Sequence, residues 1–244
     1  MFEPTFVDHL FFVLVGVYLP LSNLRQARQG MEGMTFDASM KVQIYYINGM
    51  MLWLGAFIAL GIWWANDRPL MLLGFRPPVL NLWVIGLTIF FVLAYLVDLY
   101  RETQFAERRR KTIEHWKKHT PFLPENVAEL QHFNFLAISA GIAEEIVFRG
   151  FFITYWLSIF GQSSSDRFWA VLIPALIFSV GHSYQGLKAV VKIFVLAVLF
   201  GYLFLLSESL WLVMLLHVAV DMISGRVMME VMMAERDSEL PNAQ

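Results

Sequence analysis

Long apolar runs constrain the fold of this chain more than any other feature. Seven runs of roughly twenty residues can be read, at 6–21, 42–65, 79–100, 131–157, 168–184, 189–206 and 209–225. A helix needs about 20 apolar residues to cross about 30 Å of hydrocarbon. Barrel strands would instead alternate over about 10 residues. We therefore predict an all-α membrane protein with about seven transmembrane helices.

The composition supports a membrane protein. Of the 244 residues, 58% are hydrophobic and 16% are charged, against about 45–50% and about 25% in soluble proteins. The first run is the weakest, because it is short and begins near Asp8 and His9. Acidic residues rather than Lys or Arg precede it, which argues against a cleaved signal peptide. The absence of cysteine removes disulfides, thiolate ligands and a cysteine nucleophile.

Lys and Arg in the loops predict the orientation, because cytoplasmic loops of membrane proteins are enriched in them. With an external N-terminus, the internal loops hold 14 basic residues: Arg25, Arg28, Lys41, Arg101, Arg108, Arg109, Arg110, Lys111, Lys117, Lys118, Lys188, Lys192, Arg226 and Arg236. The external loops hold 3, namely Arg68, Arg76 and Arg167. This distribution predicts an N-out, C-in protein.

Four regions follow from this pattern. Residues 1–100 are predicted to form an N-terminal three-span region, and 131–225 a core of four helices with a conical or bundle-like shape, which holds the candidate catalytic residues given below. Residues 101–130 are the only long polar segment, which is either a helix on the anionic cytoplasmic leaflet or a solvated linker. Residues 226–244 form a polar tail, which we expect to be disordered after Met233.

Ionisable groups inside spans are costly and mark candidate functional sites. The fourth run contains Glu144, Glu145 and Arg149 among apolar and small residues. Glu145 and Arg149 are i,i+4 neighbours on a helix and can pair. Glu144 lies about 140° from Arg149 by helix geometry and lacks that partner. A carboxylate free in a poorly solvated site can take a proton from water. Gly141, one turn earlier, allows another helix to approach closely.

Two further runs carry histidines. The fifth run ends at His182, on the same face as Phe178, and the seventh run holds His217 and Asp221 at i,i+4. A carboxylate at that spacing can orient an imidazole. Estimates of depth place Glu144, His182, His217 and Asp221 in the middle-to-cytosolic part of the membrane, so one shared site is feasible.

These three motifs together resemble a known family. The order Glu144-Glu145-x-x-x-Arg149, Phe178-x-x-x-His182 and His217-x-x-x-Asp221 is similar to that of the CPBP family of intramembrane, metal-independent glutamic proteases. That family comprises CAAX prenyl endopeptidases, bacteriocin-processing enzymes and Abi proteins. The resemblance covers about 131–225.

The resemblance implies specific roles. Glu144 would activate the attacking water with help from His182, and Glu145 and Arg149 would support the site, as would Phe178 by packing. His217 and position 221 would stabilise the oxyanion. The CAAX-cleaving branch typically has Asn at position 221, whereas an ionised Asp221 would repel an oxyanion. Either Asp221 is protonated, or it orients His217 and leaves His217 to donate. We expect the second, because the i,i+4 contact supplies the orientation directly.

The leading hypothesis is an intramembrane endopeptidase that cleaves a membrane-associated peptide or protein, without a cofactor and without a nucleic-acid partner. We expect it in a prokaryotic plasma membrane, with the site open toward the cytosol. One alternative is a metal-dependent hydrolase, with Glu144, Glu145, His182, His217 and Asp221 as zinc ligands. The others are a proton-coupled transporter or binding protein, since Glu and His also build proton relays, and a scaffold that does not cleave.

Overall fold

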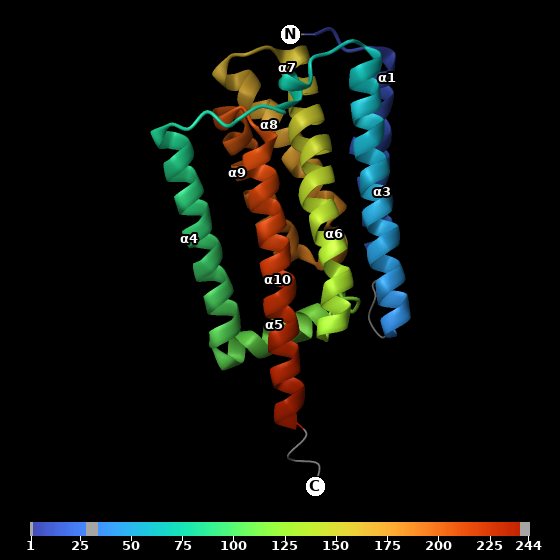
Figure 1. Cartoon of the computed structure of the whole chain (residues 1–244), viewed down its shortest axis with the longest axis vertical. Coiled ribbons are helices and arrows are strands. Elements are labelled where there is room, and N and C mark those ends of the chain that lie inside the picture. The colour runs from blue at the N-terminus through green and yellow to red at the C-terminus, as the bar shows by residue number, and fades with distance from the viewer. Residues whose placement is uncertain (1, 28–33, 240–244) are drawn as a thin grey trace.

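The chain folds as a bundle of long helices. The computed structural model describes residues 2–27 and 34–239, and every regular element in these ranges is helical. The N-terminus lies at one end of the long axis and the C-terminus at the other (Figure 1). The all-α prediction is confirmed for the described residues, which do not include Arg28.

Five helices are long and apolar enough to cross a membrane, namely Phe6–Arg25, Ala38–Ala65, Leu82–Gln104, Leu187–Ser207 and Leu210–Arg236. They match five of the seven predicted spans. The predicted spans at 131–157 and 168–184 are also helical, but neither is among the five. The first carries Glu144, Glu145 and Arg149, and the helix that contains the second carries Asp166 and Arg167 near its start, so both helices are less apolar than the other five. The chain is thus a multi-pass membrane protein by composition and length, and the total of seven spans stays a prediction.

The N-terminal half contains three of these long helices. The first is built from α1 (Phe6–Phe11), the π-helical η1 (Phe12–Tyr18) and α2 (Leu19–Ala27). Then follow α3 (Ala38–Ala65), the short η2 (Leu70–Leu73), α4 (Leu82–Gln104) and α5 (Ala106–His119). Helix α5 lies across the end of the bundle that is opposite the N-terminus (Figure 1). The segment at 101–130 therefore contains a helix, in agreement with the first of the two interpretations.

The C-terminal half supplies the helices that carry the candidate site. The first stretch is continuous and consists of α6 (Val127–Glu145), the π-helical η3 (Ile146–Ile153) and α7 (Thr154–Phe160). After it come α8 (Ser164–Gly181), η4 (Ser183–Gln185), α9 (Leu187–Ser207) and α10 (Leu210–Glu239). Helix α10 continues as a helix beyond Met233, so the prediction of disorder is wrong up to Glu239, where the described residues end.

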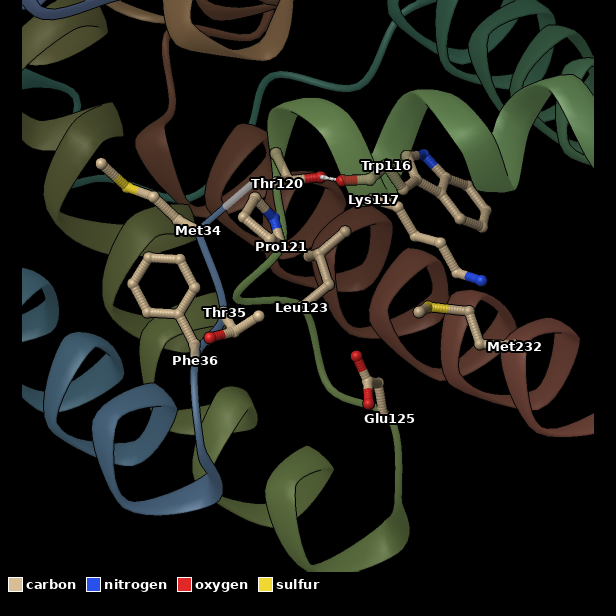
Figure 2. Close-up of a pocket in the computed structure, with 10 residues that line it drawn as sticks. All are labelled: Met34, Thr35, Phe36, Trp116, Lys117, Thr120, Pro121, Leu123, Glu125 and Met232. Atoms are coloured by element: carbon tan, nitrogen blue, oxygen red, sulfur yellow. Dashed lines mark hydrogen bonds between the residues drawn. The ribbon is translucent and has the colours of Figure 1, made fainter. Parts of the chain in front are cut away.

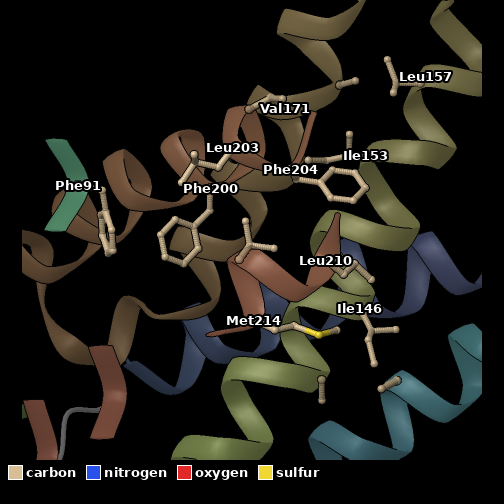
Figure 3. Close-up of a cluster of buried hydrophobic side chains, with 14 residues drawn as sticks. Phe91, Ile146, Ile153, Leu157, Val171, Phe200, Leu203, Phe204, Leu210 and Met214 are labelled. Carbon is tan, nitrogen blue, oxygen red and sulfur yellow. The ribbon is translucent and has the colours of Figure 1, made fainter. Parts of the chain in front are cut away.

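An apolar core joins these C-terminal helices. Figure 3 shows Ile153 of η3 beside Phe204 of α9, and Ile146 of η3 beside Leu210 and Met214 of α10. Lipid tails are as apolar as these side chains, so close packing rather than exclusion of water favours the association. A short turn at residues 208–209 connects α9 to α10 and brings both helices onto η3.

One glycine sets the distance between α6 and α10. A Cβ atom built on Gly141 would lie 2.5 Å from Val218 Cγ2 and 2.6 Å from Val218 N. Only a residue without a side chain allows this approach, and the close contact predicted for Gly141 is confirmed. Val218 follows His217 directly, so the contact fixes the height of His217 against the turn that carries Glu144.

Buried ion pairs connect the N-terminal helices to the rest. Asp8, whose side chain is 0% exposed, accepts two hydrogen bonds of 2.7 Å from Arg68. At the opposite end, Lys41 of α3 pairs with Glu129 of α6 at 3.1 Å. Burying such charges is tolerated because each has a partner. Asp8 therefore does not prevent the first helix from lying in the membrane.

Candidate active site

Glu145 holds the centre of the candidate site. Its Oε1 accepts a hydrogen bond of 2.8 Å from Arg149 and another of 2.8 Å from His217 Nδ1. The Glu145 side chain is 0% exposed and that of Arg149 is 4% exposed. The ion pair predicted from the i,i+4 spacing is confirmed. The same carboxylate also reaches α10, so it joins two helices that are distant in sequence.

The local helix geometry changes directly after Glu145. Residues Ile146–Ile153 are π-helical, and Arg149 lies in the middle of that segment. A π-helical turn is wider than an α-helical one and is often found at functional sites. The sequence contains no signal for this widening, and regular α-helical geometry was the only basis for the prediction.

Two aromatic rings enclose the charged groups. The Arg149 guanidinium lies 4.9 Å from the ring centroid of Phe178 and 5.6 Å from that of Phe200. The His217 ring lies 6.4 Å from Phe178 and 6.0 Å from Phe200. Helix α8 supplies Phe178 and α9 supplies Phe200, so all four C-terminal helices contribute to the site. Phe200 was not predicted, because a phenylalanine in an apolar span carries no distinguishing signal.

Glu144 lies beside this cluster without joining its hydrogen bonds. Its Oε2 is 3.8 Å from His217 Nε2, beyond hydrogen-bonding distance. The side chain is 12% exposed, whereas that of Glu145 is fully buried. The adjacent glutamates thus occupy different environments, as predicted. Glu145 is fixed by Arg149, as the spacing indicated, and also by His217, whereas Glu144 has only the longer contact with His217 among the described residues.

The prediction that Asp221 orients the His217 ring is wrong. Asp221 Oδ2 lies 3.6 Å from His217 Nε2, so the expected i,i+4 contact exists. The hydrogen bond that orients the ring, however, is made by Glu145 to Nδ1. Glu145 therefore performs the orienting role that the spacing assigned to Asp221. Spacing within one helix could not reveal a partner on another helix. Asp221 is 31% exposed and lies toward the accessible side of the site.

His182 contacts the ring of Phe178, which also lies beside His217. Its ring centroid is 4.5 Å from that of Phe178, and its Nδ1 bonds the Phe178 carbonyl at 2.8 Å. Among the residues described, it makes no ion pair or hydrogen bond with Glu144. If Nδ1 carries the proton for that bond, Nε2 is left as an acceptor. The contacts of His182 are thus with Phe178 and Tyr184, and its Nε2 is available for a further hydrogen bond.

The turn after α8 adds a residue that the sequence did not indicate. The Tyr184 ring stacks on His182 with centroids 6.2 Å apart, and its hydroxyl accepts a 3.0 Å hydrogen bond from Gln185. The ring therefore lies at the edge of the site, beside His182.

Two hollows elsewhere are separate from the site. One of about 510 Å³ lies along α3 and is lined by Met50, Trp53, Leu54 and Phe57. Another of about 310 Å³ opens at the end that holds α5, and Figure 2 shows its lining residues, including Trp116, Lys117 and Met232. Glu144 lines neither hollow. In the described part of the chain, no three His, Asp or Glu side chains are arranged to hold a metal ion.

The fold and the cluster define a class: a helical membrane protein that holds two carboxylates and an imidazole together within its C-terminal helices. Residues 126–223 match the family model described as type II CAAX prenyl endopeptidase Rce1-like. This match over 98 residues confirms the resemblance drawn from the motifs, and it indicates a protease of the membrane. The match contains Glu144, Glu145, Arg149, His182, His217 and Asp221. No curated protein and no solved structure matches the chain.

Proposed function

We propose that this protein is an intramembrane endopeptidase that hydrolyses a membrane-associated peptide or protein, with Glu144 as the base that activates water. The supporting observation is the contrast between the two neighbouring glutamates. Glu145 is committed to Arg149 and His217, whereas Glu144 is free and 3.8 Å from the same imidazole. Hydrolysis by a general base needs a carboxylate that is available to take a proton, next to a group that can stabilise the charge that develops on the substrate.

In the proposed reaction, Glu144 takes a proton from water, and the water oxygen bonds to the carbonyl carbon of the substrate. The carbonyl oxygen becomes an oxyanion, which the Nε2–H of charged His217 stabilises. The C–N bond then breaks, and the proton held by Glu144 passes to the leaving amine. One donor of this kind contributes about 3–4 kcal/mol to the barrier in soluble proteases.

Other residues position these groups. Glu145 holds Nδ1 of His217 and thereby directs Nε2 toward Glu144 and Asp221. Phe178 supports Arg149 and His217 from the side of α8. We assign Asp221 to positioning at the accessible edge, and His182 to assisting the water through its free nitrogen.

The proposal includes the membrane arrangement. The residues predicted as internal, such as Lys188 and Lys192, pair with Glu102 near the end of the bundle that holds α5. Arg68 pairs with Asp8 at the N-terminal end. We therefore assign seven spans, with the N-terminus outside and the α5 end facing the cytosol of a prokaryotic cell.

The test compares the wild type with Glu144→Gln after reconstitution in lipid. Each is incubated with membranes of the source organism from a strain in which the gene has been deleted. New peptide termini are then identified by mass spectrometry. A matched control is Glu230→Gln, on the exposed part of α10, where the carboxylate pairs with Arg226. We expect new termini with the wild type and the control but not with Glu144→Gln. Full activity of Glu144→Gln would overturn the proposal, as would solute or proton flux without any cleavage.

A further inference from the structure

Helix α5 has one face against the protein and one face away from it. Thr112 and Ile113 are buried, and Trp116 is half-buried, so these residues form the inner face. The exposed face is basic and carries Arg108, Arg110, Lys111, Lys117 and Lys118, together with Glu107 and Glu114. The helix therefore has a defined inward side, which a freely solvated linker would not need.

The exposed face has more positive than negative charge. The helix contains six basic residues (108–111, 117 and 118) and two acidic residues (107 and 114), which gives a formal charge of 6 − 2 = +4. Its internal ion pairs join Lys111 to Glu107 at 2.6 Å and Arg110 to Glu114 at 3.9 Å. Basic residues therefore outnumber acidic ones on this helix, which gives α5 a net positive charge of its own.

The placement of α5 matches a membrane surface. It follows α4, a candidate span, almost directly, and lies across the end of the bundle rather than along it (Figure 1). Phe105, between the two helices, is 54% exposed, and Tyr100 of α4 is 60% exposed. Exposed aromatic rings are enriched where a membrane protein meets the headgroups. A helix that begins at this level and runs parallel to the surface presents its basic side chains to the headgroups.

We propose that α5 binds anionic lipid headgroups and thereby fixes the turn Ser183–Gly186 beside the candidate site. The link to the turn is direct. His115 Nε2 bonds the Gln185 carbonyl at 2.9 Å, and a Cβ atom on Gly186 would lie 3.0 Å from His115 Cε1. Gly186 has a φ of +87°, so a larger residue is disfavoured there for a second reason. The turn carries Tyr184, whose ring stacks on His182. The position of α5 thus determines the position of this edge of the site.

The absence of cysteine makes a specific experiment possible, because one introduced cysteine is a unique labelling position. Ala106→Cys, at the exposed start of α5, receives a fluorophore, and Gln162→Cys, exposed at the opposite end, is the matched control. The protein is reconstituted in phosphatidylcholine nanodiscs with a trace of lipid that carries a nitroxide quencher on its headgroup. The quencher lipid is phosphatidylglycerol in one sample and phosphatidylcholine in the other. The quenching constant for phosphatidylglycerol divided by that for phosphatidylcholine reports the local enrichment of anionic lipid.

We expect a ratio of about five or more at position 106, since each basic side chain near the surface enriches anionic lipid about fivefold. The ratio should approach one in about 1 M salt, where the screening length is about 3 Å. At position 162 it should be near one throughout. The triple substitution Arg108→Gln, Arg110→Gln and Lys117→Gln should abolish the enrichment.

A control triple with Arg76→Gln, Arg167→Gln and Arg226→Gln removes the same charge elsewhere and should leave the ratio at position 106 unchanged. Equal ratios at positions 106 and 162 in the wild-type background, or a ratio at 106 that salt does not change, would overturn the proposal. These two comparisons need no charge variant, so they remain decisive if the triple substitution does not fold. Neither depends on peptidase activity, so a failure here is separate from a failure of the proposed function.

Discussion

Replacing Glu145 with glutamine should destabilise the protein far more than the same replacement of Glu144. Glu145→Gln keeps the shape of the side chain but removes the charge that receives hydrogen bonds from Arg149 and His217. Hydrogen bonds to a charged group contribute about 1.5–3 kcal/mol each. Loss of one partner from a buried ion pair costs about 3–5 kcal/mol, because the other charge stays buried without compensation. Arg149, at 3% exposure, would be left in that state.

Glu144→Gln removes a carboxylate that is partly exposed and 3.8 Å from its nearest charged neighbour. The pair with His217 is mostly buried but makes no hydrogen bond, and replacing Glu144 by a neutral amide also removes the cost of burying its charge, so we expect a loss of about 1 kcal/mol or less. The expected difference between the two variants is therefore several kcal/mol, although the residues are adjacent in sequence.

The assay is thermal unfolding in one detergent, followed by tryptophan fluorescence. For proteins of this length, 1 kcal/mol changes the Tm by about 2–4 °C. We expect Glu145→Gln to lower the Tm by about 6–20 °C and Glu144→Gln to lower it by about 4 °C or less. Equal decreases, or a larger decrease for Glu144→Gln, would show that the assignment of the two carboxylates is reversed or absent.

Two further predictions concern individual contacts, at Gly141 and at His115, and a third concerns metal dependence. Gly141→Ala should lower both Tm and activity, because its Cβ would meet the Val218 backbone at 2.6–2.8 Å, whereas Gly55→Ala, with nothing within 4 Å, should lower neither. Burial lowers the pKa of His115 below its ordinary 6.5, and the neighbouring His119 acts in the same direction. The folded protein therefore favours neutral His115. The contact of His115 with the turn is stable above pH 6.5 and is lost as the pH falls through the lowered pKa. The protection of the Gly186 amide, which is its exchange rate relative to the intrinsic rate at the same pH, should therefore decrease as the pH falls, and His115→Gln should remove this dependence. Peptidase activity should persist after dialysis against a chelator, and loss that zinc restores would favour the metal-dependent alternative.

The fold class was predictable because long apolar helices follow from the cost of unpaired backbone groups in lipid. Five of the predicted spans are confirmed as candidate spans. Their observed ends lie within about one helical turn of the predicted ends, except for the C-terminal end of the last helix. That helix continues as far as Glu239. The polar composition after Met233 suggested disorder, but polar residues such as Glu235 and Arg236 also form helices readily.

The site was partly predictable for a related reason. Neighbours within one helix, such as Glu145 and Arg149, follow from spacing alone. Partners on different helices do not, so the bond from His217 to Glu145 was missed and Asp221 was assigned the role instead. Tyr184 was missed because it lies in a turn whose position depends on α8, α9 and α5 together.

The most direct test of the role of Glu144 follows the oxygen atom of the attacking water. Cleavage is performed in water enriched in ¹⁸O, with the reconstituted wild type and with Glu144→Gln at matched amounts of folded protein. If Glu144 activates water for hydrolysis, each new peptide carboxyl group formed by the wild type carries one ¹⁸O, and Glu144→Gln forms none of these peptides. The same labelled peptides at the same rate from Glu144→Gln would contradict the account.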